Sequence, residues 1–90
     1  MKLRSADVTW REIDGQSIIL DLAASTYLTT NHTGSVLLRA LTKECTEDDL
    51  ADALVATFGI SREQAATDVD AFVTSLRERS LLEAVGSGAA

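Results

Sequence analysis

The chain contains no proline, one cysteine and one histidine among its 90 residues. A single cysteine, Cys45, cannot form an internal disulfide or a cysteine-based metal cluster, which is consistent with a reducing compartment. No stretch approaches the roughly 20 apolar residues of a membrane-spanning helix, and residues 1–7 lack the apolar core of a signal peptide. The sequence therefore predicts a cytoplasmic protein with no membrane partner and no metal site.

Side chains that commonly catalyse reactions are also scarce. His32 lies in a predicted turn beside a helix start, where capping or solvent exposure is a far commoner role than proton transfer. Cys45 has acidic neighbours, which raise the pKa of a thiol and disfavour a nucleophilic thiolate. The acidic stretch from Glu44 to Asp49 lacks calcium-loop spacing, and no phosphate-binding glycine loop or nucleophile elbow occurs. We therefore expect no enzyme activity, no catalytic residue and no cofactor.

Basic residues are too few for a nucleic-acid-binding surface. The chain has 8 lysine and arginine residues against 14 acidic residues, a net charge of −6, so a phosphate backbone would be repelled over most of the surface. The composition is 46% hydrophobic and 24% charged, which allows one small domain with a single core. We assign residues 1–85 to this domain and expect residues 86–90 to form a disordered tail.

The beginning of the chain has the pattern of a β-hairpin. Residues 8–13 alternate between apolar and polar side chains, and Trp10 is on the face that we expect to cover the core. Asp14 and Gly15 follow, and this dipeptide tolerates the positive φ angles of a tight hairpin turn. The sequence therefore predicts a return strand at residues 17–22.

The return strand has apolar side chains on both faces. We expect its inner face to consist of Ile18, Leu20 and Leu22. Ile19 would then lie on the opposite face, so that face is also expected to be covered. The β-branched and aromatic residues of Thr26–Thr30 predict a third strand. Its outer edge would leave N–H and C=O groups that can pair with another chain.

Capping residues predict the starts of the first two helices. Asn31 or Thr33 can cap the first helix, which we expect at about residues 33–42. Thr46 opens the second helix, and Asp49 three residues later gives a capping box with aspartate in place of glutamate.

The third predicted helix is the longest. Gly59 ends the helix before it, and a full capping box from Ser61 to Gln64 predicts its start, with its end near Arg79. Residues 81–85 fit either a last helical turn or a short strand. The chain is thus predicted to be an α+β domain, similar to a winged helix-turn-helix, with a three-stranded antiparallel sheet followed by three helices.

Winged helices often bind DNA, so a regulatory winged-helix domain that binds DNA or a protein partner is the alternative function. The third predicted helix contains Arg62, Arg77 and Arg79 among a larger number of acidic residues. This is the wrong sign for a helix that reads a DNA groove. Duplex DNA binding with a steep salt dependence would favour the alternative.

Several motifs occur in a characteristic order: Val-x-Trp-Arg-Glu, Asp14-Gly15, Ile-Ile-Leu-Asp-Leu, Tyr27-Leu28 before Asn31-x-Thr33-Gly34, the Thr46 helix, and Asp68-Val69-x-x-Phe72-x-x-x-Leu76. Together they resemble the PqqD-like family, the precursor-peptide recognition elements of ribosomal peptide natural-product pathways. The resemblance covers about Val8 to Leu82. The size and acidity of the chain are most similar to those of the stand-alone leader-binding protein of split lasso-peptide systems.

The resemblance implies a non-catalytic module that recognises the leader region of a precursor peptide and presents it to separate enzymes, a leader peptidase and possibly a cyclase. The leader, typically with a tyrosine and a proline, would add as an antiparallel strand beside the third strand and pack against the third helix. Such strand addition obtains affinity from main-chain hydrogen bonds and specificity from side-chain pockets. One departure from the family pattern is the turn at residues 23–25, which lacks a glycine.

The resemblance also implies a set of peptide-binding residues. Thr26, Tyr27, Leu28 and Thr29 would offer backbone pairing, while Asp68, Phe72, Ser75, Leu76 and Arg79 would line the groove. From the residues alone, a role in completing the core is the alternative for Tyr27, Phe72 and Leu76. For Phe72 and Leu76 it is at least as common as a groove role, because apolar residues at helical spacing are usually buried.

Overall fold

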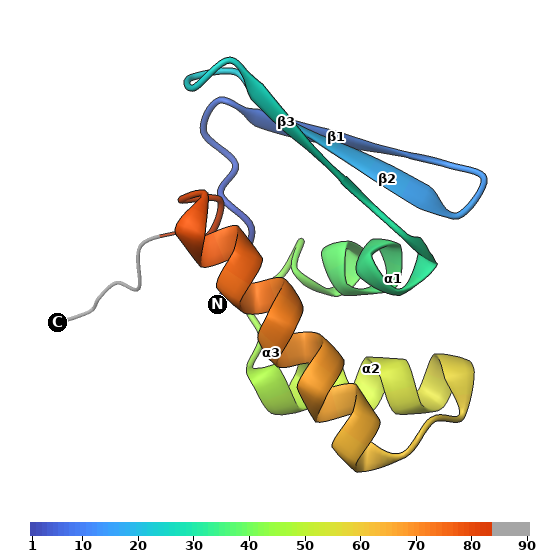
Figure 1. Cartoon of the computed structure of the whole chain (residues 1–90). Helices are drawn as coiled ribbons and strands as arrows, with labels where there is room; N and C mark the ends of the chain where they lie inside the picture. Colours follow the sequence, from blue (N-terminus) through green and yellow to red (C-terminus); the bar gives the residue numbers. More distant parts are fainter. Residues whose placement is uncertain (84–90) are drawn as a thin grey trace, which may run out of the picture.

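The computed structural model of the chain describes residues 1–83 and has a sheet packed on helices (Figure 1). The antiparallel sheet has the order β1 (Val8–Ile13), β2 (Gln16–Asp21) and β3 (Thr26–Thr30). The helices that follow are α1 (His32–Ala40), α2 (Glu47–Phe58) and α3 (Arg62–Glu78). The predicted α+β class, with three strands before three helices, is confirmed.

The two turns of the sheet differ in sequence. Asp14 and Gly15 have φ angles of 54° and 81°, as their sequence predicts for a tight hairpin. Ser25 has a φ of 57° in the second turn, although a side chain in this region costs about 1–2 kcal/mol. The Oδ1 atom of Asp21 accepts a hydrogen bond from the Ala24 N–H at 3.2 Å, which holds this turn without a glycine.

The predicted inner face of β2 is wrong. Ile19 is 1% exposed and faces the helices, whereas Leu20 is 37% exposed on the other side of the sheet. Trp10 and Leu28 are the cross-strand partners of Ile19, and both pack against the core. Burying Ile19 places Ile18 on the opposite face, because successive side chains of a strand alternate.

Two buried polar residues account for this error. Ser17 and Asp21 share the inner face with Ile19. The hydroxyls of Ser17 and Ser35 are hydrogen-bonded at 2.6 Å, and Nη2 of Arg4 donates to Oδ1 of Asp21 at 2.9 Å. Polar groups can be buried when such partners satisfy them. Both partners come from other segments of the chain, so the local alternation of β2 cannot indicate them.

The helix caps agree with the sequence except in one detail. The Asn31 side chain accepts from the Gly34 N–H at 3.0 Å, and a reciprocal capping box opens α2. Ser61 accepts from the Gln64 N–H at 3.0 Å. The Gln64 side chain, however, donates to Asp68 at 2.9 Å, so the full capping box predicted for α3 is only half formed.

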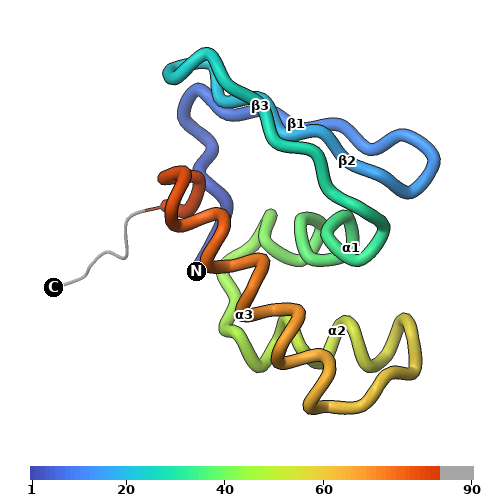
Figure 2. The backbone as a smooth tube through the Cα atoms, in the orientation of Figure 1, coloured from blue at the N-terminus to red at the C-terminus, as the bar shows by residue number. Residues whose placement is uncertain are grey.

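The ends of the described chain lie side by side (Figure 2). Leu3 and Leu82 form an antiparallel bridge, and Nη1 of Arg4 donates to the Ser80 carbonyl at 2.6 Å. The same guanidinium binds Asp21, so Arg4 connects the end of α3 to the sheet. Leu82 therefore pairs as a strand would, while residues 84–90, including the predicted tail, lie outside the described residues.

The helices supply most of the core. Its fully buried side chains include Leu37, Leu38, Leu41, Leu50, Leu54, Val69, Val73 and Leu76. Within residues 1–83, no helix has both the length and the apolarity that crossing a membrane requires.

Candidate functional site

Strand β3 forms an open edge of the sheet. It pairs with β2 on one side only. Across residues 1–83, no backbone hydrogen bond joins Thr26–Thr30 to any segment other than β2. The prediction of a third strand with an uncovered edge is confirmed.

The direction of the backbone groups on β3 follows from the register. The Leu22 N–H donates to the Asp7 carbonyl at 2.8 Å, just before β1. Because successive residues of a strand direct their N–H groups to opposite sides, Ile19 directs its N–H and C=O towards β3. Its partner Leu28 directs them back towards β2.

The residues on either side of Leu28 therefore point the other way. Tyr27 and Thr29 direct their N–H and C=O groups to the open edge. These two residues offer the donors and acceptors that a fourth antiparallel strand would use.

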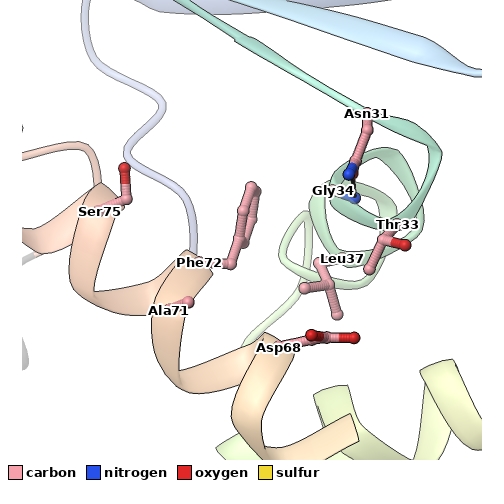
Figure 3. A pocket seen from close by; sticks show the side chains of 8 residues that line it. All are labelled: Asn31, Thr33, Gly34, Leu37, Asp68, Ala71, Phe72 and Ser75. Atoms are coloured by element: carbon pink, nitrogen blue, oxygen red, sulfur yellow. Dashed lines mark hydrogen bonds between the residues drawn. The ribbon is translucent and has the colours of Figure 1, made fainter. Parts of the chain in front are cut away.

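A groove lies between this edge and α3. A cavity of about 230 Å³ is lined by Leu28, Thr29, Thr30, Asn31, Phe72 and Ser75. A second cavity of about 310 Å³ shares Asn31, Phe72 and Ser75 and adds Thr33, Gly34, Leu37, Asp68 and Ala71 (Figure 3). We call the two cavities together the β3–α3 groove.

Gly34 allows α1 to start close to the end of β3. A Cβ atom at this position would lie 2.6 Å from Cβ of Thr30 and 3.1 Å from the Phe72 ring. Any larger residue would displace the strand or the ring. The glycine therefore sets the distance between three elements that line the groove.

The groove combines an apolar wall with polar groups at its margins. Phe72 projects from α3 towards the start of α1, above the buried Leu37 (Figure 3). Oδ1 of Asp68 accepts from Nε2 of Gln64, and no group within residues 1–83 donates a hydrogen bond to its second carboxylate oxygen. This arrangement suits an extended peptide with an apolar side chain inserted beside Phe72.

Residues 16–82 match the family model described as coenzyme PQQ synthesis protein D (PqqD). The chain belongs to the PqqD family. The resemblance found in the sequence is thus confirmed over most of the chain's length.

Two solved structures are similar to this PqqD-family chain. One is TbiB1 in complex with the TbiA(beta) leader peptide, at 28% identity over 100% of this chain and 99% of that chain, with a TM-score of 0.81. The other is lasso peptide synthetase B1 complexed with the leader peptide, at 27% identity over 87% of this chain and 91% of that chain, with a TM-score of 0.73. A comparison with curated proteins found no match.

The structure brings most of the predicted site residues of this PqqD-family domain together. Leu28, Thr29, Asp68, Phe72 and Ser75 all line the β3–α3 groove. Their role in binding a peptide remains a prediction.

Four predicted site residues are not among the residues that line the groove. Thr26 and Tyr27 belong to β3, but the expectation that Thr26 and Leu28 offer backbone pairing at the open edge is wrong, because the register directs their N–H and C=O groups towards β2. The Tyr27 side chain points away from the helices and is 65% exposed. Leu76 is 0% exposed and belongs to the core, so the expectation that it lines the groove is wrong. Arg79 follows the last turn of α3 and is not among the lining residues.

Sequence reasoning did not assign the start of α1 to the site. Asn31, Thr33 and Gly34 line the groove beside Phe72. The signal was present, because Asn31 was a predicted cap and a glycine such as Gly34 permits a close approach of neighbouring segments. Only the position of the Phe72 ring close to Gly34 shows that this cap also forms a wall of the groove.

The residues considered for catalysis lie elsewhere. Burial raises the pKa of the Cys45 thiol, the N-terminal ammonium lowers it, and Asp49 and Glu44 raise it further. The sequence argument thus had the right direction, although burial is the larger cause. The His32 ring packs edge-on against Phe58, with ring centroids 5.4 Å apart.

Proposed function

We propose that this chain is a non-catalytic module that binds the leader region of a ribosomally made precursor peptide, of the lasso type, and presents it to separate processing enzymes. The open β3 edge beside the β3–α3 groove carries this proposal. Support comes from the two similar structures, each of which holds a leader peptide. The module would act in the cytoplasm, where its precursor is made.

The proposed binding mode is strand addition. The leader would lie antiparallel to β3 and exchange hydrogen bonds with the backbone of Tyr27 and Thr29. Alternate leader side chains would then enter the groove and pack on Phe72, which gives specificity. The available carboxylate oxygen of Asp68 would accept a hydrogen bond from a polar leader group.

Presentation to other enzymes is consistent with the chemistry of the groove. Its lining residues include a serine, Ser75, and an aspartate, Asp68, but no histidine or cysteine. In this proposal the peptidase, and a cyclase after it, are separate proteins that act on the bound precursor.

A DNA-binding role receives less support. Arg62 lies at the start of α3, and its Nη1 donates a hydrogen bond to the Asp52 carboxylate. Its Nη2 lies 3.6 Å from Oδ1 of Asp48. Its charge is therefore already compensated within the protein. The net charge of −6 adds repulsion from phosphates.

Fluorescence anisotropy with a labelled leader peptide tests the proposal. We expect saturable one-to-one binding at physiological salt, and no binding of a peptide with the same composition in scrambled order. A labelled DNA duplex serves as the second probe. Tight binding of the duplex with a steep salt dependence, together with no leader binding, would overturn the proposal.

A further inference from the structure

The two walls of the β3–α3 groove are not joined to each other directly. Within residues 1–83, no hydrogen bond or ion pair connects Thr26–Thr30 of β3 with Arg62–Glu78 of α3. Helix α3 packs chiefly on α2, below the sheet in Figure 1. Contacts outside the groove must therefore set the distance between its walls.

The two ends of the groove are held in different ways. At the end near Thr30, the Phe72 ring lies close to Gly34, where an added Cβ atom would be 3.1 Å from the ring. Close packing therefore fixes this end. At the end near Thr26, the connection runs instead through a buried carboxylate and a guanidinium.

The buried carboxylate belongs to Asp21, which is 6% exposed. Asp21 is the cross-strand partner of Thr26, the first residue of β3. Its Oδ1 atom accepts hydrogen bonds from Nη2 of Arg4 at 2.9 Å and from the Ala24 N–H at 3.2 Å. The bond from Ala24 holds the turn that leads into β3, so this carboxylate oxygen fixes the start of the strand.

The guanidinium of Arg4 connects this carboxylate to the end of α3. Its Nη1 atom donates to the Ser80 carbonyl at 2.6 Å, and its Nε atom donates to the Ala6 carbonyl at 3.1 Å. The backbone N–H of Arg4 also donates to the Leu81 carbonyl at 2.7 Å. All three guanidinium nitrogens therefore bind acceptors, and these acceptors belong to three different segments of the chain.

We propose that Arg4 and Asp21 are positioning residues for the leader. Together, as the Arg4–Asp21 clamp, they hold the end of α3 at the distance from the start of β3 that an added strand requires. A gap of about 0.5–1 Å forfeits a quarter to a half of the energy of a van der Waals contact, so an outward shift of α3 would weaken the contacts of the leader with that helix. A wall that is fixed before binding also reduces the conformational entropy lost on binding. This inference rests on the proposed function, because it takes the leader to be bound at β3.

Arg4→Lys tests the clamp, because it keeps the positive charge but loses the planar fork that binds Asp21 and Ser80 together. We expect the leader Kd in fluorescence anisotropy, measured well below the melting temperature, to rise at least about fivefold as the fixed wall is lost. Thr46→Ala is the matched control, since it removes the N-cap of α2 and lowers the melting temperature without touching either wall of the groove. Its leader Kd should stay within about twofold of that of the unchanged protein, because distant sites act independently.

The distance across the groove can be measured as well. Spin labels at Ala24→Cys and Glu78→Cys, both exposed positions, report the distance between the turn before β3 and the end of α3, and Cys45→Ser removes the native thiol. Double electron resonance should give a narrow distance distribution, a broader one for Arg4→Lys, and an unchanged one for Thr46→Ala. Leader binding should narrow the Arg4→Lys distribution again.

The possible outcomes separate this inference from the proposed function. An unchanged leader Kd in Arg4→Lys would overturn the inference. Equal losses of affinity in Arg4→Lys and Thr46→Ala would also overturn it, since overall stability would then govern binding, and so would a distance distribution that Arg4→Lys leaves unchanged. If the unchanged protein binds no leader, the proposed function fails, whereas a broadened distribution in Arg4→Lys would still support the clamp.

Discussion

The two edge strands of the sheet, β1 and β3, differ in charge. β1 contains Arg11 and Glu12, and the Glu12 carboxylate lies 3.5 Å from Nε of Arg39. β3 consists of Thr26–Thr30 and has no charged side chain. Charged residues on an edge strand discourage pairing with other chains, so the sequence protects β1 and leaves β3 able to pair.

The surroundings of β3 also favour pairing with another chain. Phe72 and Ser75 of α3 form a groove beside β3. An extended chain that paired with β3 would thus gain both hydrogen bonds and apolar contacts. An exposed edge strand suits strand addition when it has no charged side chains and a helix offers pockets alongside it.

The largest expected effect concerns the outward N–H groups of β3. Thr29→Pro removes one of them without removing a hydrogen bond to β2, because this N–H points to the open edge. We expect leader binding to fall below detection in anisotropy, while the far-ultraviolet circular dichroism spectrum stays the same.

Two variants serve as controls for this prediction. Thr29→Ala shortens the side chain but keeps the N–H, and Glu12→Pro makes the same backbone change on the β1 edge. Both should bind leader with nearly the original Kd. Undiminished binding by folded Thr29→Pro would rule out strand addition at β3.

The second prediction compares the ion pair of the central strand β2 with the ion pair of the edge strand β1. Arg4→Ala leaves the Asp21 carboxylate almost fully buried without its cation, and we expect a loss of about 2–3 kcal/mol in the free energy of unfolding. Arg39→Ala removes the more exposed partner of Glu12 and should cost less than about 1 kcal/mol. Urea denaturation measures both, and equal losses would contradict the assigned role of Arg4.

The third prediction concerns the groove wall. Phe72→Leu keeps an apolar side chain but removes the flat ring, and we expect the leader Kd to rise several-fold, which is about 1 kcal/mol. Thr74→Ala changes an exposed residue of the same helix and should have no effect. If titration calorimetry gives the same Kd for Phe72→Leu and the unchanged protein, Phe72 does not contact the leader.

The smallest effect concerns the two turns of the sheet. Ser25→Gly relieves a positive φ angle in the turn before β3, so we expect the free energy of unfolding to rise by up to about 1 kcal/mol. Gly15→Ala places a side chain at a φ of 81° before β2 and should lower it by a similar amount. Thermal melts that shift in the same direction would contradict this account.

Local signals predicted the elements of the fold correctly. The Asp14-Gly15 turn, the Asn31 cap and the Thr46 capping box depend on residues close together in the chain, and all three form as expected. The edge strand could be predicted as well, because its composition and its place before a cap are local properties.

Contacts between distant segments explain what could not be predicted. Ile19 was assigned to the face opposite the predicted inner face, because Ile18, Leu20 and Leu22 alternate as three apolar side chains on one side. The burial of Ser17 and Asp21 depends on Ser35 and Arg4, which no local pattern relates to β2.

Contacts between distant segments also decide which predicted residues line the groove. Phe72 and Leu76 are one helical turn apart and equally apolar, yet only Phe72 lines the groove. Which of them is accessible depends on how α3 lies relative to β3 and the start of α1.

Amide hydrogen exchange measured by NMR, with and without leader peptide, shows whether a leader pairs with the β3 edge. The N–H groups of Tyr27 and Thr29 point to the β3 edge, and those of Trp10 and Glu12 point to the β1 edge. We predict that leader binding slows exchange at Tyr27 and Thr29 and leaves Trp10 and Glu12 unchanged. Slowed exchange on the β1 edge, or no change at β3 when the leader is bound, would contradict the account.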